Sequence, residues 1–289
     1  MQTTIGVVGY GFVGEAVARG FRHAVDVWIY DKVQGSLCMS SGSTSSSSYS
    51  SASAEPLQDL VRRVDGPIFV CVPTPMKPDG SCDTSIVAEV VAGLGTSRPI
   101  VLKSTVPPGT TGWLAAKYDA RICFNPEFLT EANSVEDFKR QDHIILGGAC
   151  GVVQEVGALY AEAFPGVHQE WVPATTAEMI KYATNAFLAT KVSFANEIKR
   201  LCAALGIPYE KMIEVAKLDP RLGESHWQVP GPDGHHGFGG SCFVKDLNAL
   251  LSVARRMDTS RAVLEGAWKT NLQVRPERDW EQLKGRAVV

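Results

Sequence analysis

The sequence lacks the features that would point to a membrane, a secreted protein or a nucleic-acid partner. No apolar run approaches the roughly 20 residues that a membrane-spanning helix needs, and because residues 5–9 already read as a strand, we expect no leader peptide. Acidic and basic side chains nearly balance, at a net charge of −3 over 289 residues, so there is no electrostatic footprint for nucleic acid. We therefore expect neither a membrane nor a nucleic-acid partner.

Paired cysteines are missing as well. The seven cysteines are an odd number without a Cys-x-x-Cys pair, so a disulfide framework is not expected. Free thiols are typical of a reducing compartment, which predicts a cytoplasmic protein. With 45% hydrophobic residues, the chain can bury a sizeable core in one or two domains.

The first informative feature is a glycine pattern between an apolar strand run at 5–9 and a helical pattern that ends near Phe21. In dinucleotide-binding turns the first glycine permits the tight turn, the second lets a pyrophosphate approach, and the third lets helix and strand pack closely. The pyrophosphate then rests on free N–H groups at the helix start. This glycine turn consists of Gly9, Tyr10, Gly11, Phe12, Val13 and Gly14.

A carboxylate follows the glycine turn at the distance that a dinucleotide site requires. The next apolar strand, residues 25–30, leads to Asp31, roughly 20 residues past the glycines. A carboxylate there accepts hydrogen bonds from the adenine-ribose hydroxyls and repels a 2′-phosphate, which favours NAD over NADP. The positive charge of the adjacent Lys32 argues against this preference for NAD. A glycine turn without a ligand is the alternative interpretation.

Strand and helix patterns alternate over the first 172 residues. This alternation predicts an α/β domain, residues 1–172, with a Rossmann-like doubly wound parallel sheet. Ligands of such sheets lie beyond the carboxyl ends of the strands. Pro73, Thr74, Ser104, Thr105 and Glu127 all fall there. The expected strands are 67–72, 99–105, 121–124 and 143–148, and the expected helices are 55–61, 84–94 and 110–117.

Ten of the fourteen residues at 40–53 are serine. Such a tract cannot bury apolar surface, so we expect a surface loop. A phosphorylation site is the alternative interpretation of this tract.

A long helix is expected at the start of the second domain, residues 173–289, which we predict to be all-helical. Thr175 with Glu178 forms a capping box, and helical residues run to Leu205 before the stop signal Gly206. A helix of this length, about 45 Å, carries apolar residues on more than one face and needs cover on several sides. A second subunit would supply that cover, so we expect a homodimer through residues 175–205.

The second informative feature is a cysteine at the point where a glycine-rich loop becomes a helix. At a helix N-terminus the thiol of Cys242 is near the positive end of the dipole, which is expected to lower its pKa. Lys245 and Asp246 follow within one turn, so a cation and a possible base lie beside the sulfur. A buried structural thiol is the alternative, but the flexible Gly239-Gly240 approach argues against it.

Three polar pairs are spaced four residues apart, which puts both side chains on one face of a helix. For each pair alone, a solvated helix face is the alternative. Lysine and amide groups inside an apolar helix can stabilise an oxyanion, and a carboxylate at a strand end can orient or activate water. The pairs are Lys181 with Asn185, Cys242 with Asp246, and Glu127 with Glu131. Adjacent His235 and His236 point to different sides, so no metal site is expected.

Taken in order, these motifs resemble the nucleotide-sugar dehydrogenases, the family of UDP-glucose 6-dehydrogenase and GDP-mannose dehydrogenase. The resemblance covers nearly the whole chain, and the cysteine loop is its most specific part. The matching motifs lie at 9–14, 72–75, 104–107, 125–129, 178–196, 219–223 and 237–246.

The resemblance implies a four-electron, NAD-dependent oxidation of a sugar C6 alcohol to the carboxylate, with UDP-glucose as the first candidate among nucleotide sugars. In this scheme Cys242 attacks an intermediate aldehyde, and the thiohemiacetal is oxidised to a thioester that water hydrolyses. The resemblance implies that Lys181 and Asn185 hold the oxyanion. Asp246 would act as a base with a water, and Glu127 would assist hydrolysis.

Further binding roles are also implied by the resemblance. Thr105 and Glu131 would order water and cofactor near the nicotinamide, and Arg221 would reach the sugar-nucleotide site of a neighbouring subunit. Cofactor contacts are implied for Gly9, Gly11, Phe12, Val13, Gly14, Asp31, Lys32, Pro73, Thr74, Thr105 and Glu131. Substrate contacts are implied for Glu127, Phe128, Leu129, Lys181, Asn185, Arg221, Phe238, Gly239 and Cys242.

The sequence departs from the family pattern in length. Typical members carry a further nucleotide-binding domain of roughly a hundred residues, so we expect a short member or a piece of a longer chain. Two other functions stay open. One is a catalytically idle NAD-binding or assembly module. The other is a two-electron hydroxyacid dehydrogenase, a class that needs no cysteine and is therefore disfavoured by Cys242.

Overall fold

The computed structural model describes residues 3–39, 47–49 and 56–289. The chain forms two compact units, of which the first comprises residues 1–74 and 84–181. The second comprises residues 75–83 and 182–289. The sequence pattern placed a domain boundary at residue 172, before the long helix. The division between the compact units instead falls inside that helix and assigns the short segment 75–83 to the second unit.

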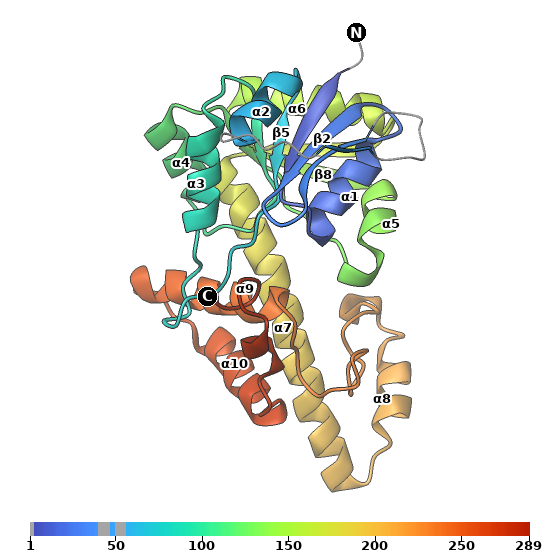
Figure 1. Ribbon diagram of the computed structural model, residues 1–289. Coiled ribbons are helices and arrows are strands. Elements are labelled where there is room, and N and C mark those ends of the chain that lie inside the picture. Colours follow the sequence, from blue (N-terminus) through green and yellow to red (C-terminus); the bar gives the residue numbers. More distant parts are fainter. Residues whose placement is uncertain (1–2, 40–46, 50–55) are drawn as a thin grey trace. The chain divides into compact units, whose positions relative to one another are not determined.

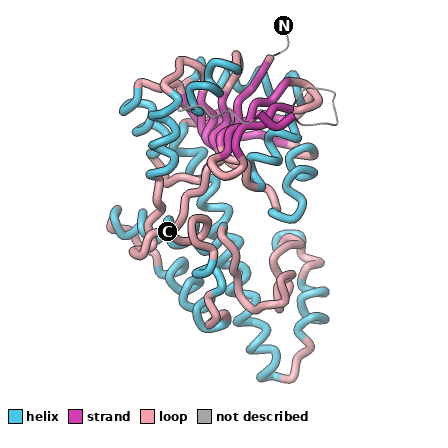
Figure 2. The backbone as a smooth tube through the Cα atoms, viewed as in Figure 1, coloured by secondary structure: helices cyan, strands magenta, loops and turns pink. Residues whose placement is uncertain are grey.

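The first unit is built on a mostly parallel sheet (Figures 1 and 2). Its strand order turns at β1, which pairs in parallel with β2 on one side and with β5 on the other. The carboxyl end of β1 is therefore the point at which such sheets bind ligands. The described residues form nine strands, in the spatial order β4-β3-β2-β1-β5-β6-β7-β8-β9. The strands are β1 (Thr4–Val8), β2 (Asp26–Asp31), β3 (Gly35–Met39), β4 (Ser47–Tyr49), β5 (Ile68–Val70), β6 (Ile100–Leu102), β7 (Ile122–Phe124), β8 (His143–Gly148) and β9 (His168–Val172).

Two apolar cores lie on the two faces of this sheet, because successive side chains of a strand point to opposite sides. On β1, Ile5 and Val7 belong to one core and Val8 to the other. Helices α1, α5 and α6 cover the first core, whereas α2, α3, α4 and the first turns of α7 cover the second. The bounds are α1 (Phe12–Phe21), α2 (Pro56–Arg63), α3 (Ser85–Leu94), α4 (Thr110–Tyr118), η1 (Glu131–Asn133), α5 (Ser134–Lys139), α6 (Cys150–Ala163) and α7 (Ala174–Leu205).

The predicted doubly wound α/β fold is confirmed, with local differences in strand direction. β8 runs antiparallel to β7, and β3 runs antiparallel to β2. The serine tract at 40–53 contains β4, which pairs with β3. The loop prediction is therefore wrong for residues 47–49, because backbone pairing in a sheet needs no apolar side chain. The rest of the tract lies outside the described residues.

The predicted long helix is confirmed as α7, whose 32 residues span about 48 Å. The predicted capping box at its start is wrong. The carboxylate of Glu178 instead accepts hydrogen bonds from the backbone N–H groups of Gly109 at 2.5 Å and Thr111 at 2.7 Å. These N–H groups belong to the start of α4 and have no partner within that helix, so Glu178 caps α4 and not its own helix.

The second unit is helical, as predicted. An isolated bridge pairs Met76 with Val288 and so joins the segment 75–83 to the last residues of the chain. One core surrounds Leu247 and Trp280, and a smaller one surrounds Trp227. Besides most of α7, the elements are α8 (Tyr209–Ala216), η2 (Pro220–Leu222), α9 (Cys242–Arg256), α10 (Ala262–Val274) and η3 (Asp279–Gln282). No helix in the described part of the chain is both long and apolar enough to cross a bilayer.

Candidate functional site

The glycine turn joins β1 to α1 with the contacts that a dinucleotide site needs. Gly9 has a φ of +90°, and a Cβ there would lie 2.8 Å from the carbonyl oxygen of Cys71. A Cβ on Gly14 would lie 1.9 Å from the carbonyl oxygen of Gly9, so helix and turn meet at backbone distance. A Cβ on Gly11 would meet nothing within 4 Å, which leaves open space at the N-terminus of α1. Phe12 and Val13 form the first turn of that helix.

Asp31, the last residue of β2, fastens the glycine turn. Its Oδ2 accepts a hydrogen bond from the Tyr10 backbone N–H at 2.8 Å, and its Oδ1 accepts from Val33 and Gln34 at 2.8 and 3.0 Å. Burial acts to raise the pKa of this carboxyl, but the three backbone hydrogen bonds hold the pKa below its usual value. The ionised carboxylate of Asp31 and the open turn fit NAD. Lys32 is exposed beside it.

The predicted cofactor residues after β5 and β6 are connected to each other. The Thr74 hydroxyl donates a hydrogen bond to the Thr105 carbonyl oxygen at 2.9 Å, and both residues are buried. Pro73 precedes them and is exposed. β1, β5 and β6 are parallel neighbours, so this contact lies at the same edge of the sheet as the glycine turn.

Glu127 and Lys181 form a buried ion pair within the first unit. Nζ of Lys181 lies 2.9 Å from Oε1 of Glu127, and the two side chains are only 5% and 6% exposed. The same ammonium donates to the Glu127 carbonyl oxygen at 2.5 Å, and the Leu129 backbone N–H donates to Oε2 at 2.8 Å. Burial acts to raise the pKa of Glu127, but the charge of Lys181 and the Leu129 hydrogen bond hold it below its usual value. Phe128 lies with its ring centre 5.4 Å from the ammonium.

Lys103, directly after β6, is a second buried lysine that the sequence analysis did not single out. Its Nζ donates to Asn125 Oδ1 at 3.0 Å and to the Pro126 carbonyl oxygen at 3.4 Å. Burial lowers the pKa of this amine to about 8. Lys103 thus fixes the turn that presents Glu127. The available signal was a lysine placed directly after a strongly apolar strand.

Glu127 and Glu131 do not share a helical face, contrary to the sequence expectation. Residues 125–130 form no helix, and Glu131 is exposed at the first position of η1. Pro126 disfavours helical backbone at the residue before it, and the Leu129 N–H bonds to the Glu127 side chain instead of a helical carbonyl. Glu131 is therefore not brought to Glu127 by helical spacing.

In the second unit, α9 begins at Cys242, as predicted, so its partly exposed thiol stands at a helix N-terminus. Its Sγ lies 3.8 Å from Ser241 Oγ. Asp246, one turn later, is 1% exposed and uses both carboxylate oxygens. Oδ1 accepts from Lys245 Nζ and Oδ2 accepts from the Asn185 amide, each at 2.6 Å. Asn185, Asp246 and Lys245 are therefore connected at the start of the helix that carries the thiol.

Lys245 is the cation of this cluster, noted in the sequence pattern but not placed among the predicted site residues. Burial acts to lower its pKa, but the negative charges of Asp246 and Cys242 raise the pKa above its usual value. The thiol of Cys242 thus lies within electrostatic reach of the Lys245 ammonium. The cluster therefore combines a thiol, a cation and a carboxylate, groups of the kind that covalent catalysis uses.

The other predicted substrate residues of the second unit differ in exposure. Phe238 is buried, and its backbone is hydrogen-bonded to Asn271. A Cβ on Gly239 would lie 2.3 Å from Arg275 Nη2, so the missing side chain makes room for a guanidinium. Arg221 is 86% exposed in η2 and forms an ion pair with Asp219. Asn271 and Arg275 were not anticipated from the sequence.

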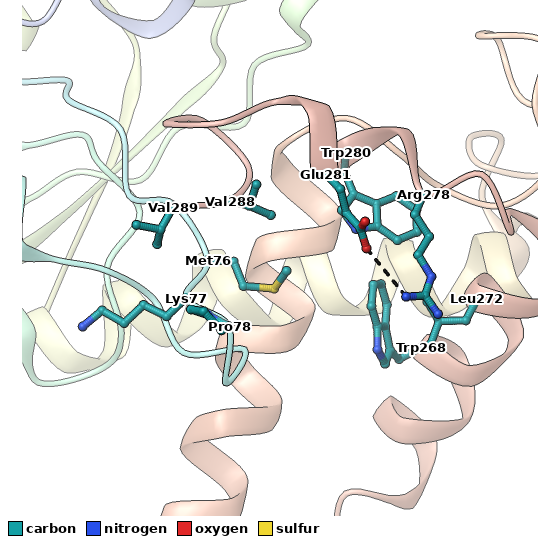
Figure 3. Close-up of a pocket in the computed structure, with 10 residues that line it drawn as sticks. All are labelled: Met76, Lys77, Pro78, Trp268, Leu272, Arg278, Trp280, Glu281, Val288 and Val289. Atoms are coloured by element: carbon teal, nitrogen blue, oxygen red, sulfur yellow. Dashed lines mark ion pairs between the residues drawn. The ribbon is translucent and has the colours of Figure 1, made fainter.

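A separate pocket of about 310 Å³ lies in the second unit (Figure 3). Trp268 and Trp280 form part of its wall, and Arg278 and Glu281 pair there at 3.6 Å. None of the predicted catalytic or binding residues lines it, so it is not part of the candidate site. The lining residues are Met76, Lys77, Pro78, Trp268, Leu272, Arg278, Trp280, Glu281, Val288 and Val289. Within the described residues, no three His, Cys, Asp or Glu side chains are grouped as metal ligands.

Two models of the UDP-glucose/GDP-mannose dehydrogenase family match the chain. The NAD binding domain matches residues 58–163, and the central domain matches residues 175–273. Over 241 residues the chain is 37% identical to the UDP-glucose 6-dehydrogenase of Rhizobium meliloti, covering 77% of this chain and 52% of the relative. The chain thus spans about half the length of the curated relatives it matches.

Solved structures agree with this match. A UDP-glucose dehydrogenase from Pyrobaculum islandicum superposes with a TM-score of 0.79 at 27% identity, covering 94% of this chain and 68% of that one. A 3-hydroxyisobutyrate dehydrogenase from Mycobacterium tuberculosis has a TM-score of 0.72 at 16% identity, covering 96% of this chain and 95% of that one. At so low an identity the second likeness shows the fold alone. With a glycine turn and Asp31 that fit NAD, the chain belongs to the UDP-glucose/GDP-mannose dehydrogenase family.

Proposed function

We propose that the protein is an NAD-dependent nucleotide-sugar dehydrogenase that oxidises the C6 alcohol of UDP-glucose to a carboxylate. Family membership supports the reaction class, and the name of the Rhizobium meliloti relative supports the substrate. The observation that carries the proposal is the position of Cys242 at the start of α9, where its thiol interacts electrostatically with the Lys245 ammonium. A hydroxyacid dehydrogenase of similar fold needs no such thiol.

The proposed role of Cys242 is to hold the substrate between two oxidations. The first removes a hydride and a proton from the alcohol and gives an aldehyde. The Cys242 thiolate then bonds to the aldehyde carbon, and the oxygen takes a proton to form a thiohemiacetal. Loss of a second hydride and proton leaves a thioester. NAD, when bound, accepts the two hydrides, one per molecule.

Lys181 and Asn185 are proposed to stabilise negative charge on substrate oxygens. The Lys181 ammonium has three N–H groups, and its two contacts to Glu127 leave one further donor. The Asn185 amide donates one N–H to Asp246 and carries a second. Each side chain is held by a carboxylate and so is pre-oriented, which is what oxyanion stabilisation requires. Asp246 also remains the proposed base, acting with a water.

Glu127 is proposed to assist the final hydrolysis. Its carboxylate is ionised and fixed, so it can accept a proton from the water that attacks the thioester. The C–S bond then breaks, Cys242 leaves as the thiolate, and the acid is released. Thr105 and Glu131 are proposed to order water and cofactor near the nicotinamide.

Turnover with a panel of nucleotide sugars tests this proposal. UDP-glucose, GDP-mannose and UDP-N-acetyl sugars are each supplied with NAD, and the product is identified by mass spectrometry. We expect the acid of UDP-glucose to form fastest. If acid forms only from another sugar, UDP-glucose is not the substrate. If no sugar is oxidised, the result favours the catalytically idle NAD-binding module.

We also propose that the protein is a homodimer through α7. Phe187, Phe194 and Leu201 recur every seven residues, and Leu205 lies one turn further along. These side chains are 67%, 50%, 55% and 65% exposed, respectively. Seven residues are close to two helical turns, so the four form one apolar stripe. A second copy offers an identical stripe that would cover this one in an isologous interface. In such a dimer the exposed Arg221 is proposed to reach the sugar-nucleotide site of the neighbouring subunit.

Light scattering during size-exclusion chromatography tests the dimer. We expect twice the chain mass of 31.2 kDa for the wild type and the single-chain mass for Phe194→Glu. Arg200→Glu changes an exposed side chain of α7 outside the stripe and serves as the control. A wild type of single-chain mass at about 10 μM, a concentration at which a stable interface of standard size stays closed, would contradict the dimer.

A further inference from the structure

The loop before Cys242 has little structure of its own. Residues 231–240, here called the glycine loop, form neither helix nor strand. Two short backbone hydrogen bonds close within it, from Gly231 N–H to the His235 carbonyl at 2.7 Å and from Gly234 N–H to the Gly231 carbonyl at 2.9 Å. Because glycine restricts the backbone least, the conformation of this loop has to be imposed by other segments.

A buried guanidinium imposes part of that conformation. Arg275, at the end of α10, is 2% exposed, and its Nη1 pairs with Asp233 of the glycine loop at 2.8 Å. Its Nε and Nη2 pair with the two oxygens of Asp279 at 2.6 and 2.8 Å. The guanidinium also lies against the backbone of Gly239, where any Cβ would collide with it. Arg275 therefore ties the loop to the end of α10 at two points.

Two amides fix the residues between those points. Asn271, one turn before Arg275, accepts from the Phe238 backbone N–H at 2.7 Å and donates to its carbonyl at 3.0 Å. On α7, Asn196 Oδ1 accepts from the Gly237 backbone N–H at 3.2 Å. Gly237, Phe238 and Gly239 are thus each held by another segment, and Gly239 lies three residues before Cys242.

We propose that Arg275 is a positioning residue for Cys242. Held between Asp233 and Asp279, it fixes the glycine loop and thereby the place of the thiol at the start of α9. The guanidinium is buried, whereas the carboxylates of Asp233 and Asp279 are 47% and 38% exposed. Burying a charge for an ion pair seldom adds net stability compared with apolar packing, so this network suits a positional role. The inference rests on the proposed role of Cys242 as the nucleophile.

Alkylation of Cys242 by iodoacetamide tests the inference without cofactor or sugar. Peptide mass spectrometry gives the rate from pH 6 to pH 9, and Cys150, exposed at the start of α6, is a reference thiol in the same sample. In Arg275→Met we expect the Cys242 rate at pH 7 to fall about five-fold and its pH profile to move up by about 0.7 unit, because the thiolate loses its place beside Lys245. The Cys150 profile should not change. The groups that act on Lys245, namely Cys242, Asp246 and Cys82, are kept in every variant.

Asp233→Asn separates positioning from folding. It weakens the loop contact while the Arg275–Asp279 pair stays, so we expect a smaller shift of the Cys242 profile in the same direction, even if Arg275→Met does not fold. Arg261→Met removes a partly exposed guanidinium that precedes α10 and pairs with Glu265 of that helix, and it is the control. An unchanged Cys242 profile in every variant that folds overturns the proposal. The expected shift in a protein that oxidises no sugar would support the positioning role and refute the proposed function.

Discussion

The two glycine-rich segments of this protein obtain their conformations in different ways. The glycine turn at 9–14 is shaped by close backbone contacts, such as that between Gly14 and Gly9, and the side chains of Asp31 and Gln34 bind Tyr10 within it. The glycine loop at 231–240 is held by side chains of α7 and α10.

The difference follows from what each segment has to present. A turn that receives a pyrophosphate offers backbone N–H groups and needs open space, which glycine provides locally. A loop that leads to a nucleophile must place one sulfur atom, and glycine alone cannot fix a position. The conformation of the first segment is therefore sensitive to a Cβ added at Gly9 or Gly14, and that of the second to the loss of distant side chains.

The largest expected effect is on acid formation, which depends on the segment that leads to Cys242 and not on the glycine turn alone. Cys242→Ser removes the nucleophile, so we expect acid formation to fall by at least about 1000-fold. NAD affinity, which depends on the glycine turn, should stay within two-fold. Product analysis and NAD titration measure the two quantities, and Cys150→Ser is the matched control. Acid formation at the wild-type rate in Cys242→Ser would refute the covalent role.

An added methyl group in the turn should have the next largest effect. In Gly14→Ala the Cβ would lie 1.9 Å from a backbone oxygen, so the turn must move. We expect NAD affinity to fall about 100-fold and the melting temperature to drop by several degrees. Gly11→Ala meets open space and should keep its melting temperature while still weakening NAD binding. Equal melting temperatures for wild type and Gly14→Ala would contradict a turn shaped by close backbone contact.

Loss of the Asp31 carboxylate, which helps to fasten the turn, should have a smaller effect. Asp31→Ser removes the carboxylate that receives the Tyr10 N–H and repels a 2′-phosphate. We expect NAD to bind about ten-fold more weakly and the preference for NAD over NADP to narrow. Isothermal titration with both cofactors measures this. If the preference for NAD over NADP does not change, Asp31 does not contact the cofactor.

The smallest expected effect is on the pH dependence of stability, and it compares two buried carboxylates of the first unit. Glu127 is paired mainly with a side chain, whereas Glu178 is hydrogen-bonded to backbone N–H groups. The charge of Lys181 overcomes burial and holds the pKa of Glu127 below its usual value, whereas burial raises the pKa of Glu178 despite its backbone hydrogen bonds. The stabilisation from Glu127 is present above the unfolded pKa of about 4.3 and is lost as the pH falls through the lower folded pKa. The contribution of Glu178 is full below that unfolded value and declines as the pH rises through its higher folded pKa.

Urea unfolding of Glu127→Gln and Glu178→Gln from pH 3 to pH 7 measures these contributions. The stability lost in Glu127→Gln should grow with pH, and that lost in Glu178→Gln should shrink. Each unit of pKa difference corresponds to about 1.4 kcal/mol. If the stability lost in the two variants changes with pH in the same direction, the pKa values of the two carboxyls are not shifted in opposite directions, contrary to this prediction.

Local signals allowed much of the fold and part of the candidate site to be predicted from the sequence. The glycine turn, the carboxylate at the end of β2 and the helix start at Cys242 each depend on residues a few positions apart. The long helix was also predicted, because its apolar pattern and its stop signal are continuous along the chain.

Partners that are distant in sequence could not be predicted. Glu178 and Thr111 are 67 residues apart, and Arg275 and Asp233 are 42 apart. A sequence shows that such side chains are charged but not which group will meet the charge after folding. Lys103 was missed for the same reason, since its partners become neighbours only when β6 and β7 pair.

The most direct test of the account is the number of NADH molecules formed for each molecule of UDP-glucose consumed. The chain is incubated with limiting UDP-glucose and excess NAD, and absorbance at the end of the reaction is compared with the sugar lost. A Cys242 nucleophile that holds the aldehyde for a second oxidation requires a ratio of two. A ratio of one, with free aldehyde as the product, would contradict the account.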